Sequence, residues 1–223
     1  MTYDLIIVTQ SRADLIQMTQ ECINSALADT KDINAIIVES GQPYKYNNVN
    51  RFIEYNGVFN YNRALNLGLK YAKNEIQILA NNDLIFKQGW SRIGEQMKST
   101  GYHSASASSI GQPEGNFLYE SYEIGKFLNG WCIFLDRYCL EQIGQLDETC
   151  SFWYSDNLYA CQIKSLGIKH ALFCNCHVDH ITSQTLIKQS SSIQRRYQQG
   201  ELGKFKTRQR YYAERETIFQ NNS

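Results

Sequence analysis

Short runs of apolar residues alternate along the chain with segments whose apolar positions recur at helical spacing. Continuous apolar runs are typical of buried parallel strands, and helical periodicity predicts helices packed against a sheet. The runs predict strands at residues 5–8, 35–38, 76–80, 130–135 and 168–174. The periodic segments predict helices that begin at Asp14 and that span residues 61–72, 137–143 and 155–166. This alternation predicts an α/β fold, with a mainly parallel sheet flanked by helices.

Two segments do not follow this alternation. Residues 99–118 are rich in Ser, Gly and Ala and contain Pro113, so they are interpreted as a loop. Beyond residue 185 the chain is polar, basic and Tyr-containing, and we expect it to be partly helical. The pattern therefore predicts an α/β domain over residues 1–185 and a basic C-terminal extension over residues 186–223.

Length and composition agree with this division. The chain has 223 residues, and its hydrophobic share of 43% is enough to form a core. No apolar run approaches the roughly 20 residues that span a bilayer. The N-terminal sequence lacks the basic start and the cleavage site of a signal peptide, and the seven cysteines are an odd number. We therefore expect a cytoplasmic protein with free thiols and no transmembrane segment.

Charge is unevenly distributed, although the formal net charge is zero. Residues 1–185 contain 14 Lys and Arg against 19 Asp and Glu, which is −5, whereas residues 186–223 contain 8 against 3, which is +5. The extension is interpreted either as a solvated terminal helix or as a basic segment with a binding role. Its mixture of basic and aromatic residues is typical of segments that bind phosphates and stack on bases, or that lie on an anionic membrane.

A polar turn follows the predicted strand at residues 76–80. It consists of Asn81, Asn82 and Asp83. Ligands of open α/β sheets bind beyond the carboxyl ends of the strands. A carboxylate with oxygen-bearing neighbours at that place suits Mg²⁺ or Mn²⁺ holding a diphosphate. The alternative is an ordinary Asn/Asp turn that only ends the strand.

A second acidic residue, Asp156, stands at the start of a predicted helix. It follows Ser155 and the aromatic run of residues 152–154. The helix N-terminus is expected to keep the pKa of Asp156 low, which restricts its strength as a base without excluding base catalysis. The alternative is that Ser155 or Asp156 only caps the helix.

His180 lies just past the last predicted strand. A ring nitrogen of His180 could complete a metal site, or the side chain could contact a diphosphate. The nearby residues Cys174, Cys176 and His177 are also capable of binding metal. A structural zinc site is therefore a separate hypothesis, although the spacing matches no standard zinc pattern.

In order and spacing, these motifs resemble those of family 2 glycosyltransferases, which have the Rossmann-like GT-A fold. The resemblance runs from about Tyr3 to Thr185. It rests on residues 6–9 with Arg12, Glu39, Gly57, residues 64–68, 79–83 and 129–131, Arg137, residues 143–144, 146–148 and 155–156, and His180 with Thr185. The chain departs from the family pattern in two ways: Ser155 replaces the common Glu, and Asp83 is the only charged residue of its motif.

The resemblance implies an inverting enzyme that uses a nucleotide diphosphate-sugar. Asp156 would be the catalytic base, and Asp83 with His180 would hold Mn²⁺ or Mg²⁺. The implied donor contacts are Thr9, Arg12, Glu39, Asn66, Asn82, Asp83 and Gly130. The implied acceptor contacts are Trp131, Asp147 and Trp153. The alternatives are that Asp147 stabilises its loop and that the two Trp side chains fill the core.

The acceptor and the reaction class have alternatives. A glycan or a lipid-linked sugar is the expected acceptor, whereas the basic extension also fits glycosylation of a hydroxylated base in DNA, as some phage enzymes perform. A nucleotidyltransferase would also use an α/β sheet and acidic metal ligands, and a non-catalytic binding protein or metal-binding module could share the fold. The donor sugar, its nucleotide and the oligomeric state are not specified by these patterns.

Overall fold

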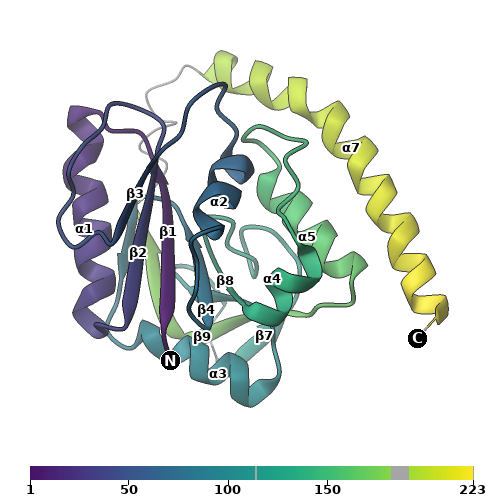
Figure 1. The fold of residues 1–223 in the computed structure, drawn as a ribbon. Coiled ribbons are helices and arrows are strands. Elements are labelled where there is room, and N and C mark those ends of the chain that lie inside the picture. Colours follow the sequence, from purple (N-terminus) through teal and green to yellow (C-terminus); the bar gives the residue numbers. More distant parts are fainter. Residues whose placement is uncertain (114, 182–190, 223) are drawn as a thin grey trace.

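A computed structural model describes residues 1–113, 115–181 and 191–222, and it shows a central sheet between helices (Figure 1). The strand order is β3-β2-β1-β4-β8-β6-β9-β5, and β7 pairs with β9. The strands are β1 (Tyr3–Thr9), β2 (Ile33–Glu39), β3 (Arg51–Glu54), β4 (Ile76–Ala80), β5 (Leu84–Phe86), β6 (Ser104–Ser108), β7 (Leu118–Glu120), β8 (Cys132–Asp136) and β9 (His170–His180). The helices are α1 (Ala13–Asp29), α2 (Tyr61–Leu69), the short 3₁₀ helix η1 (Trp90–Arg92), α3 (Ile93–Thr100), α4 (Arg137–Ile143), α5 (Ser155–Ser165) and α7 (Ser191–Asn222).

Parallel pairing of β3, β2, β1 and β4 places their carboxyl ends at one edge of the sheet. Thr9 pairs with Glu39 across β1 and β2, and Ile7 pairs with Ala80 across β1 and β4. The next strand, β8, is antiparallel to both β4 and β6, while β6 and β9 are parallel. The predicted α/β fold, with helices flanking the sheet, is confirmed.

The two faces of the sheet bury different sets of side chains. Leu5 and Ile7 of β1 join a cluster that includes residues of α1, η1 and α3. Ile6 and Val8 join a cluster with residues of α2, α4 and α5. Because both faces are covered, the central strands have continuous apolar sequences rather than alternating ones.

Gly68 permits the close approach of α2 to the sheet. A Cβ atom at this position would lie 2.5 Å from Cγ2 of Ile6 and 3.1 Å from Cγ2 of Val38. This approach fixes the position of the helix whose first residue, Tyr61, enters the functional site described below.

The prediction of a loop over residues 99–118 is wrong, because β6 lies within that range. All five residues of β6 are buried, yet they are only Ser and Ala. The hydroxyl groups of Ser104 and Ser106 lie 2.7 and 3.2 Å from the two ring nitrogens of His170, whose side chain is fully buried. Polar partners inside the sheet therefore replace the hydrophobic pattern that a buried strand normally has.

The last predicted strand extends further than expected. The prediction ended it at residue 174, whereas β9 continues to His180 and pairs with β5 through Leu84. His180 is therefore held in a strand beside Asp83 instead of lying in a loop. Thr185, which the resemblance pairs with His180, falls outside the described residues.

The C-terminal extension is more ordered than the partly helical segment that we expected. Residues Ser191–Asn222 form the single helix α7, which runs along the outside of α5 (Figure 1). Phe205 and Tyr212 of α7 pack against Cys150 and Leu158 in a small apolar cluster. Within the described part of the chain, no helix has both the length and the apolar character that a membrane span requires.

Candidate functional site

A cleft of about 370 Å³ opens at the carboxyl edge of the parallel strands. Such edges are where open α/β sheets bind their ligands. Segments after β1, β2 and β4, the start of α2, the loop before α5 and the end of β9 contribute to its wall. Its lining residues are Val8, Thr9, Gln10, Leu15, Ser40, Gly57, Phe59, Tyr61, Asn81, Asn82, Asp83, Phe152 and His180.

The buried Asp83 and the partly buried His180 form an acid–imidazole pair in this cleft. Oδ1 of Asp83 lies 3.1 Å from Nε2 of His180, so the two groups are at ion-pair distance. Neither atom makes a hydrogen bond within the described part of the chain. The structure thus brings together the two residues that the sequence selected as metal ligands.

This pair fits a divalent ion that also binds a diphosphate. No group of three or more His, Cys, Asp or Glu side chains suited to a metal ion occurs among the described residues. Mg²⁺ is commonly held by one or two carboxylates together with substrate phosphates, so a site with few protein ligands is chemically reasonable. The zinc hypothesis gains no support, because the thiol of Cys176 contacts Oε1 of Gln96 at 3.3 Å and that of Cys174 contacts the Pro113 carbonyl at 3.5 Å.

Neighbouring polar groups fix the turn that carries Asp83. The amide nitrogen of Asn82 donates to the hydroxyl oxygens of Thr9, at 3.2 Å, and Thr19, at 3.0 Å. The hydroxyl of Tyr61 donates to Oδ1 of Asn81 at 2.8 Å. The cleft therefore has a prearranged polar wall that links β1, α1 and α2.

Glu39 links the loops that follow β1 and β2. Its buried carboxylate accepts hydrogen bonds from the backbone N–H groups of Ser11, at 2.8 Å, and Gly41, at 2.6 Å, and from the Ser11 hydroxyl. Arg12, at the start of α1, is partly buried and follows the same loop. Glu39 and Arg12 lie beside the cleft but do not belong to the residues that line it.

Asp156 lies in the first turn of α5 and is not one of the residues that line the cleft. Its Oδ1 accepts a hydrogen bond of 2.9 Å from the Asn157 N–H, and its side chain packs so closely on Gly130 that a Cβ atom there would lie 2.4 Å from that of Asp156. Trp131, the next residue after Gly130, stacks on His180 with a centroid distance of 5.3 Å and an interplanar angle of 15°. This series of contacts connects Asp156 to the Asp83–His180 pair.

The prediction of a low pKa for Asp156 is wrong. Burial raises the pKa of its carboxyl above the usual value, and this effect outweighs the backbone hydrogen bonds that lower it. The helix is not capped by either candidate residue, because its N-cap is Tyr154, with no side-chain cap. Burial also raises the pKa of the Tyr61 hydroxyl, and the negative charges of Asp83 and Asp156 raise it further, which places Tyr61 near both acids.

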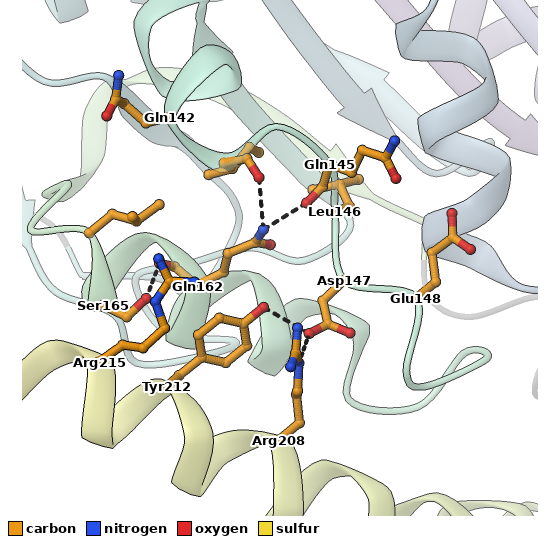
Figure 2. A pocket seen from close by; sticks show the side chains of 12 residues that line it. Gln142, Gln145, Leu146, Asp147, Glu148, Gln162, Ser165, Arg208, Tyr212 and Arg215 are labelled. Atoms are coloured by element: carbon orange, nitrogen blue, oxygen red, sulfur yellow. Dashed lines mark hydrogen bonds and ion pairs between the residues drawn. The ribbon is translucent and has the colours of Figure 1, made fainter.

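Asp147 does not face the cleft, so its predicted role in acceptor binding is not supported. Its Oδ2 accepts hydrogen bonds from Nε of Arg208 and, at 2.7 Å, from the Tyr212 hydroxyl, and Oδ1 accepts one from the Thr149 N–H at 2.9 Å. Figure 2 shows this junction in a second pocket, of about 420 Å³, beside α7. Burial alone would raise the pKa of Asp147, but the hydrogen bonds from Arg208, Thr149 and Tyr212 lower it overall.

Asn66 also lies away from the cleft. Its amide nitrogen donates to the Leu146 carbonyl at 2.9 Å and to Glu148 at 3.0 Å, and its amide oxygen accepts from the Leu146 N–H at 2.9 Å. These bonds hold the chain around Leu146 against α2. The side chain has a structural task in this fold, and the predicted donor contact is not supported.

Three aromatic residues of the cleft were missed by the sequence reasoning. Phe59 and Phe152 are 37% and 40% exposed, and their ring centroids lie 6.5 Å apart. Tyr61 contacts Phe152 edge-on at 6.1 Å. Trp153, the predicted acceptor contact, packs edge-on against Phe152 at 5.7 Å and is partly buried. The aromatic run before Asp156 contained a signal for Phe152, whereas no local pattern indicates Phe59 or Tyr61.

Comparison with solved structures agrees with this architecture. One similar structure is GalNAc-T7 crystallised with UDP, GalNAc and Mn²⁺, with a TM-score of 0.65 and 12% identity over 80% of this chain and 43% of that one. Another is S. aureus TarS, with a TM-score of 0.60 and 13% identity over 82% of this chain and 37% of that one. The chain thus spans less than half the length of either protein. No family profile and no curated protein sequence matches it. At this level of identity the likeness concerns architecture, and the chain has the GT-A glycosyltransferase fold.

Proposed function

We propose that this chain is an inverting glycosyltransferase that moves a sugar from a nucleoside diphosphate-sugar to an acceptor hydroxyl. The Asp83–His180 pair carries the proposal, because its facing atoms are buried, 3.1 Å apart and without hydrogen bonds. Both atoms keep unused hydrogen-bonding capacity in a buried position, so a ligand that contacts them is favoured. A divalent ion, Mn²⁺ or Mg²⁺, with a diphosphate would satisfy both atoms. The likeness to a protein crystallised with UDP, GalNAc and Mn²⁺ supports this choice.

Asp156 is proposed as the base. The acceptor oxygen forms a bond to the anomeric carbon while the bond from that carbon to the diphosphate oxygen breaks, and the bonding electrons leave with the diphosphate. Asp156 takes the proton of the attacking hydroxyl, and attack from the opposite face inverts the configuration. A bound divalent ion supplies positive charge that stabilises the leaving diphosphate. The raised pKa of Asp156 brings its basicity closer to neutral pH, where a general base is most effective.

The donor is proposed to lie along the polar wall of the cleft. Thr9 and Asn82 line this wall and are held by hydrogen bonds, so they can present oriented polar groups to it. Glu39 would act by shaping the two loops beside the donor, with Arg12 at their edge. Phe59 and Phe152 offer exposed rings on which a base or the apolar face of a sugar could stack.

The acceptor is proposed to be a glycan or a lipid-linked sugar. One observation keeps DNA as a second candidate, namely the exposed cationic residues of α7: Arg195, Arg196, Lys204, Lys206 and Arg210. Such a cationic face attracts phosphates without reading bases, so it fits any polyanionic acceptor.

A screen of nucleotide-sugars for thermal stabilisation and for hydrolysis, with Mn²⁺ and with EDTA, tests the function. We expect one class of nucleotide-sugar to raise the melting temperature in Mn²⁺ and to do so much less in EDTA, because ligand binding to the folded state stabilises it. A nucleoside triphosphate that stabilises the protein and is turned over to pyrophosphate would instead indicate a nucleotidyltransferase. No stabilisation by any nucleotide-sugar would contradict the proposal.

A further inference from the structure

Helix α7 contacts the turn that leads into the proposed base. We call residues 150–154 the entry turn, because they connect the segment around Asp147 to α5. Glu201 of α7 is 9% exposed, and its carboxylate accepts hydrogen bonds from the backbone N–H groups of Ser151 and, at 3.2 Å, Phe152. A single acidic side chain thus satisfies two successive N–H groups of the entry turn.

A second contact supports the end of the entry turn. Tyr154 has a left-handed backbone conformation, with φ at 66°. This conformation is unfavourable for an aromatic residue and persists where the surrounding structure enforces it. The Tyr154 ring stacks on Phe205 of α7, with a centroid distance of 4.9 Å and an interplanar angle of 5°. Tyr154 is the N-cap of α5, so its conformation sets the direction in which that helix and Asp156 begin.

The helix is anchored on the same face beyond the entry turn. Arg208 and Tyr212 bind the carboxylate of Asp147 (Figure 2). Together with Glu201 and Phe205 they stand at positions i, i+4, i+7 and i+11, which share one face of a helix. Arg208 and Tyr212 hold α7 to the domain, whereas Glu201 and Phe205 contact the entry turn.

We propose that Glu201 and Phe205 are positioning residues that hold the entry turn, and through it Asp156, in the geometry needed for proton transfer. This inference rests on the proposed function of Asp156. The side chain of Asp156 has little space in which to move, because it packs closely against Gly130. Small misplacements of reacting groups can reduce rates about 100-fold, so removal of a positioning contact acts on turnover more than on donor binding.

The test is a double-mutant cycle in the full chain, with kcat for sugar transfer and Kd for the donor measured in each variant. Glu201→Gln is expected to lower kcat about 10- to 100-fold and to change donor Kd less than about twofold. In the Asp156→Asn background the same substitution should lower kcat less than about twofold, because a residue that acts only through Asp156 has no effect once that carboxylate is lost. Glu214→Gln, an exposed acid on the same helix, is the matched control and should leave kcat unchanged.

Phe205→Leu gives an independent cycle, because it removes the stacked ring while keeping an apolar side chain. The melting temperature of each variant is measured alongside. Equal losses of kcat in both backgrounds, or a loss of donor binding parallel to that of kcat, would overturn the proposal. Unfolding of both variants would also overturn it, since α7 would then be part of the folding unit and not a support for Asp156. Absence of transfer by the unmutated chain would instead overturn the proposed function itself.

Discussion

Single residues in the cleft have unusual environments, and the clearest case is Asp83. Its Oδ1 and the His180 Nε2 are buried within 3.1 Å of each other without a hydrogen bond. The cleft therefore places a carboxylate oxygen and an imidazole nitrogen side by side, and both are common ligands of divalent metal ions. The same cleft contains exposed aromatic rings, so one ligand could bind a cation held by Asp83 and stack on an aromatic side chain.

Asp83→Asn should weaken Mn²⁺-dependent binding of the nucleotide-sugar at least about 10-fold, as expected when a group around a bound metal is lost. The amide keeps the size of the side chain but removes the charge that attracts the cation. Calorimetric titration of the donor in Mn²⁺ and in EDTA measures the effect. Asp179→Asn is the control, because Asp179 precedes His180 but pairs with Lys87 at 3.0 Å. Full activity in excess EDTA would contradict the metal site.

Asp156→Asn should bind the donor normally and transfer sugar at least about 100-fold more slowly, because a base acts only in the transition state. Single-turnover kinetics and donor titration separate the two effects. In the unmutated chain kcat should fall as the pH drops through the raised pKa of Asp156, and this acid limb should be absent in the variant. Near-normal transfer would remove Asp156 from the mechanism, and an unfolded variant would indicate a structural role instead.

Among the strands, β6 has its hydroxyl groups beside a buried histidine. His170 is fully buried between Ser104 and Ser106, and Tyr159 also contacts Ser104, with 2.7 Å between their hydroxyl oxygens. Burial lowers the pKa of His170 to about 3. The imidazole is therefore neutral in the folded protein over a range in which it would be protonated in the unfolded chain.

This difference makes stability depend on pH. Below the ordinary histidine pKa of about 6.5 the unfolded chain binds a proton that the folded chain does not, so the free energy of unfolding falls as pH decreases. The contribution of the neutral His170 to the free energy of unfolding is fully present above about pH 6.5. It decreases by about 1.4 kcal/mol per pH unit as the pH falls from there towards pH 3. Urea unfolding at pH 7.5, 6.5, 5.5 and 4.5 should show that His170→Asn is less stable at pH 7.5 but less sensitive to acid. His103→Asn, at a partly exposed histidine paired with Asp136, is the control, and equal pH dependence in all three proteins would contradict the assignment.

In the whole molecule, helix α7 has an inner face that packs on the domain and an outer face that is exposed. Its inner face packs on α5 and the entry turn, whereas its outer face carries exposed basic side chains. The helix begins near the carboxyl edge of the sheet and runs away from it (Figure 1). Exposed basic side chains are thus carried by a helix that packs against the domain, namely those of Arg195, Arg196, Lys204, Lys206 and Arg210.

Reversal of the charge on this outer face should weaken the binding of a polyanionic acceptor and leave donor binding unchanged. The double substitution Lys206→Glu with Arg210→Glu changes exposed positions, so the melting temperature should stay close to that of the unmutated chain. Binding to DNA or to another anionic acceptor should weaken, and its dependence on salt concentration should become less steep. Lys98→Glu on α3 is the control for a single exposed cation elsewhere. Unchanged acceptor binding with a neutral glycan as the preferred substrate would exclude a role for this face.

Deletion of residues 190–223 is a different experiment. We predict from the charge pattern that it weakens acceptor engagement more than donor binding. The buried contacts of Phe205, Tyr212 and Glu201 add that the truncated chain should also unfold more easily. Equal losses of donor and acceptor binding would show that α7 is a structural part of the fold.

The main strands, the helices on the faces of the sheet and the order of the acidic motifs could be predicted from the amino-acid pattern. These features follow from local hydrophobic patterns, and the carboxyl edge follows from parallel pairing. Asp83, Asp156 and His180 could be selected in this way because polar residues at strand ends and helix starts stand out against apolar runs.

The surroundings of these residues follow from the packing of distant segments and could not be predicted from the amino-acid pattern. Burial, not the helix N-terminus, governs the pKa of Asp156. Asp147 and Asn66 hydrogen-bond to distant segments and are thereby removed from the cleft, while Phe59 and Tyr61 enter it. Strand β6 was missed because its Ser and Ala residues form no hydrophobic pattern, and the polar partner His170 lies more than 60 residues away. Desolvation, hydrogen-bond partners and the docking of α7 depend on contacts between segments far apart in the chain, which no local pattern encodes.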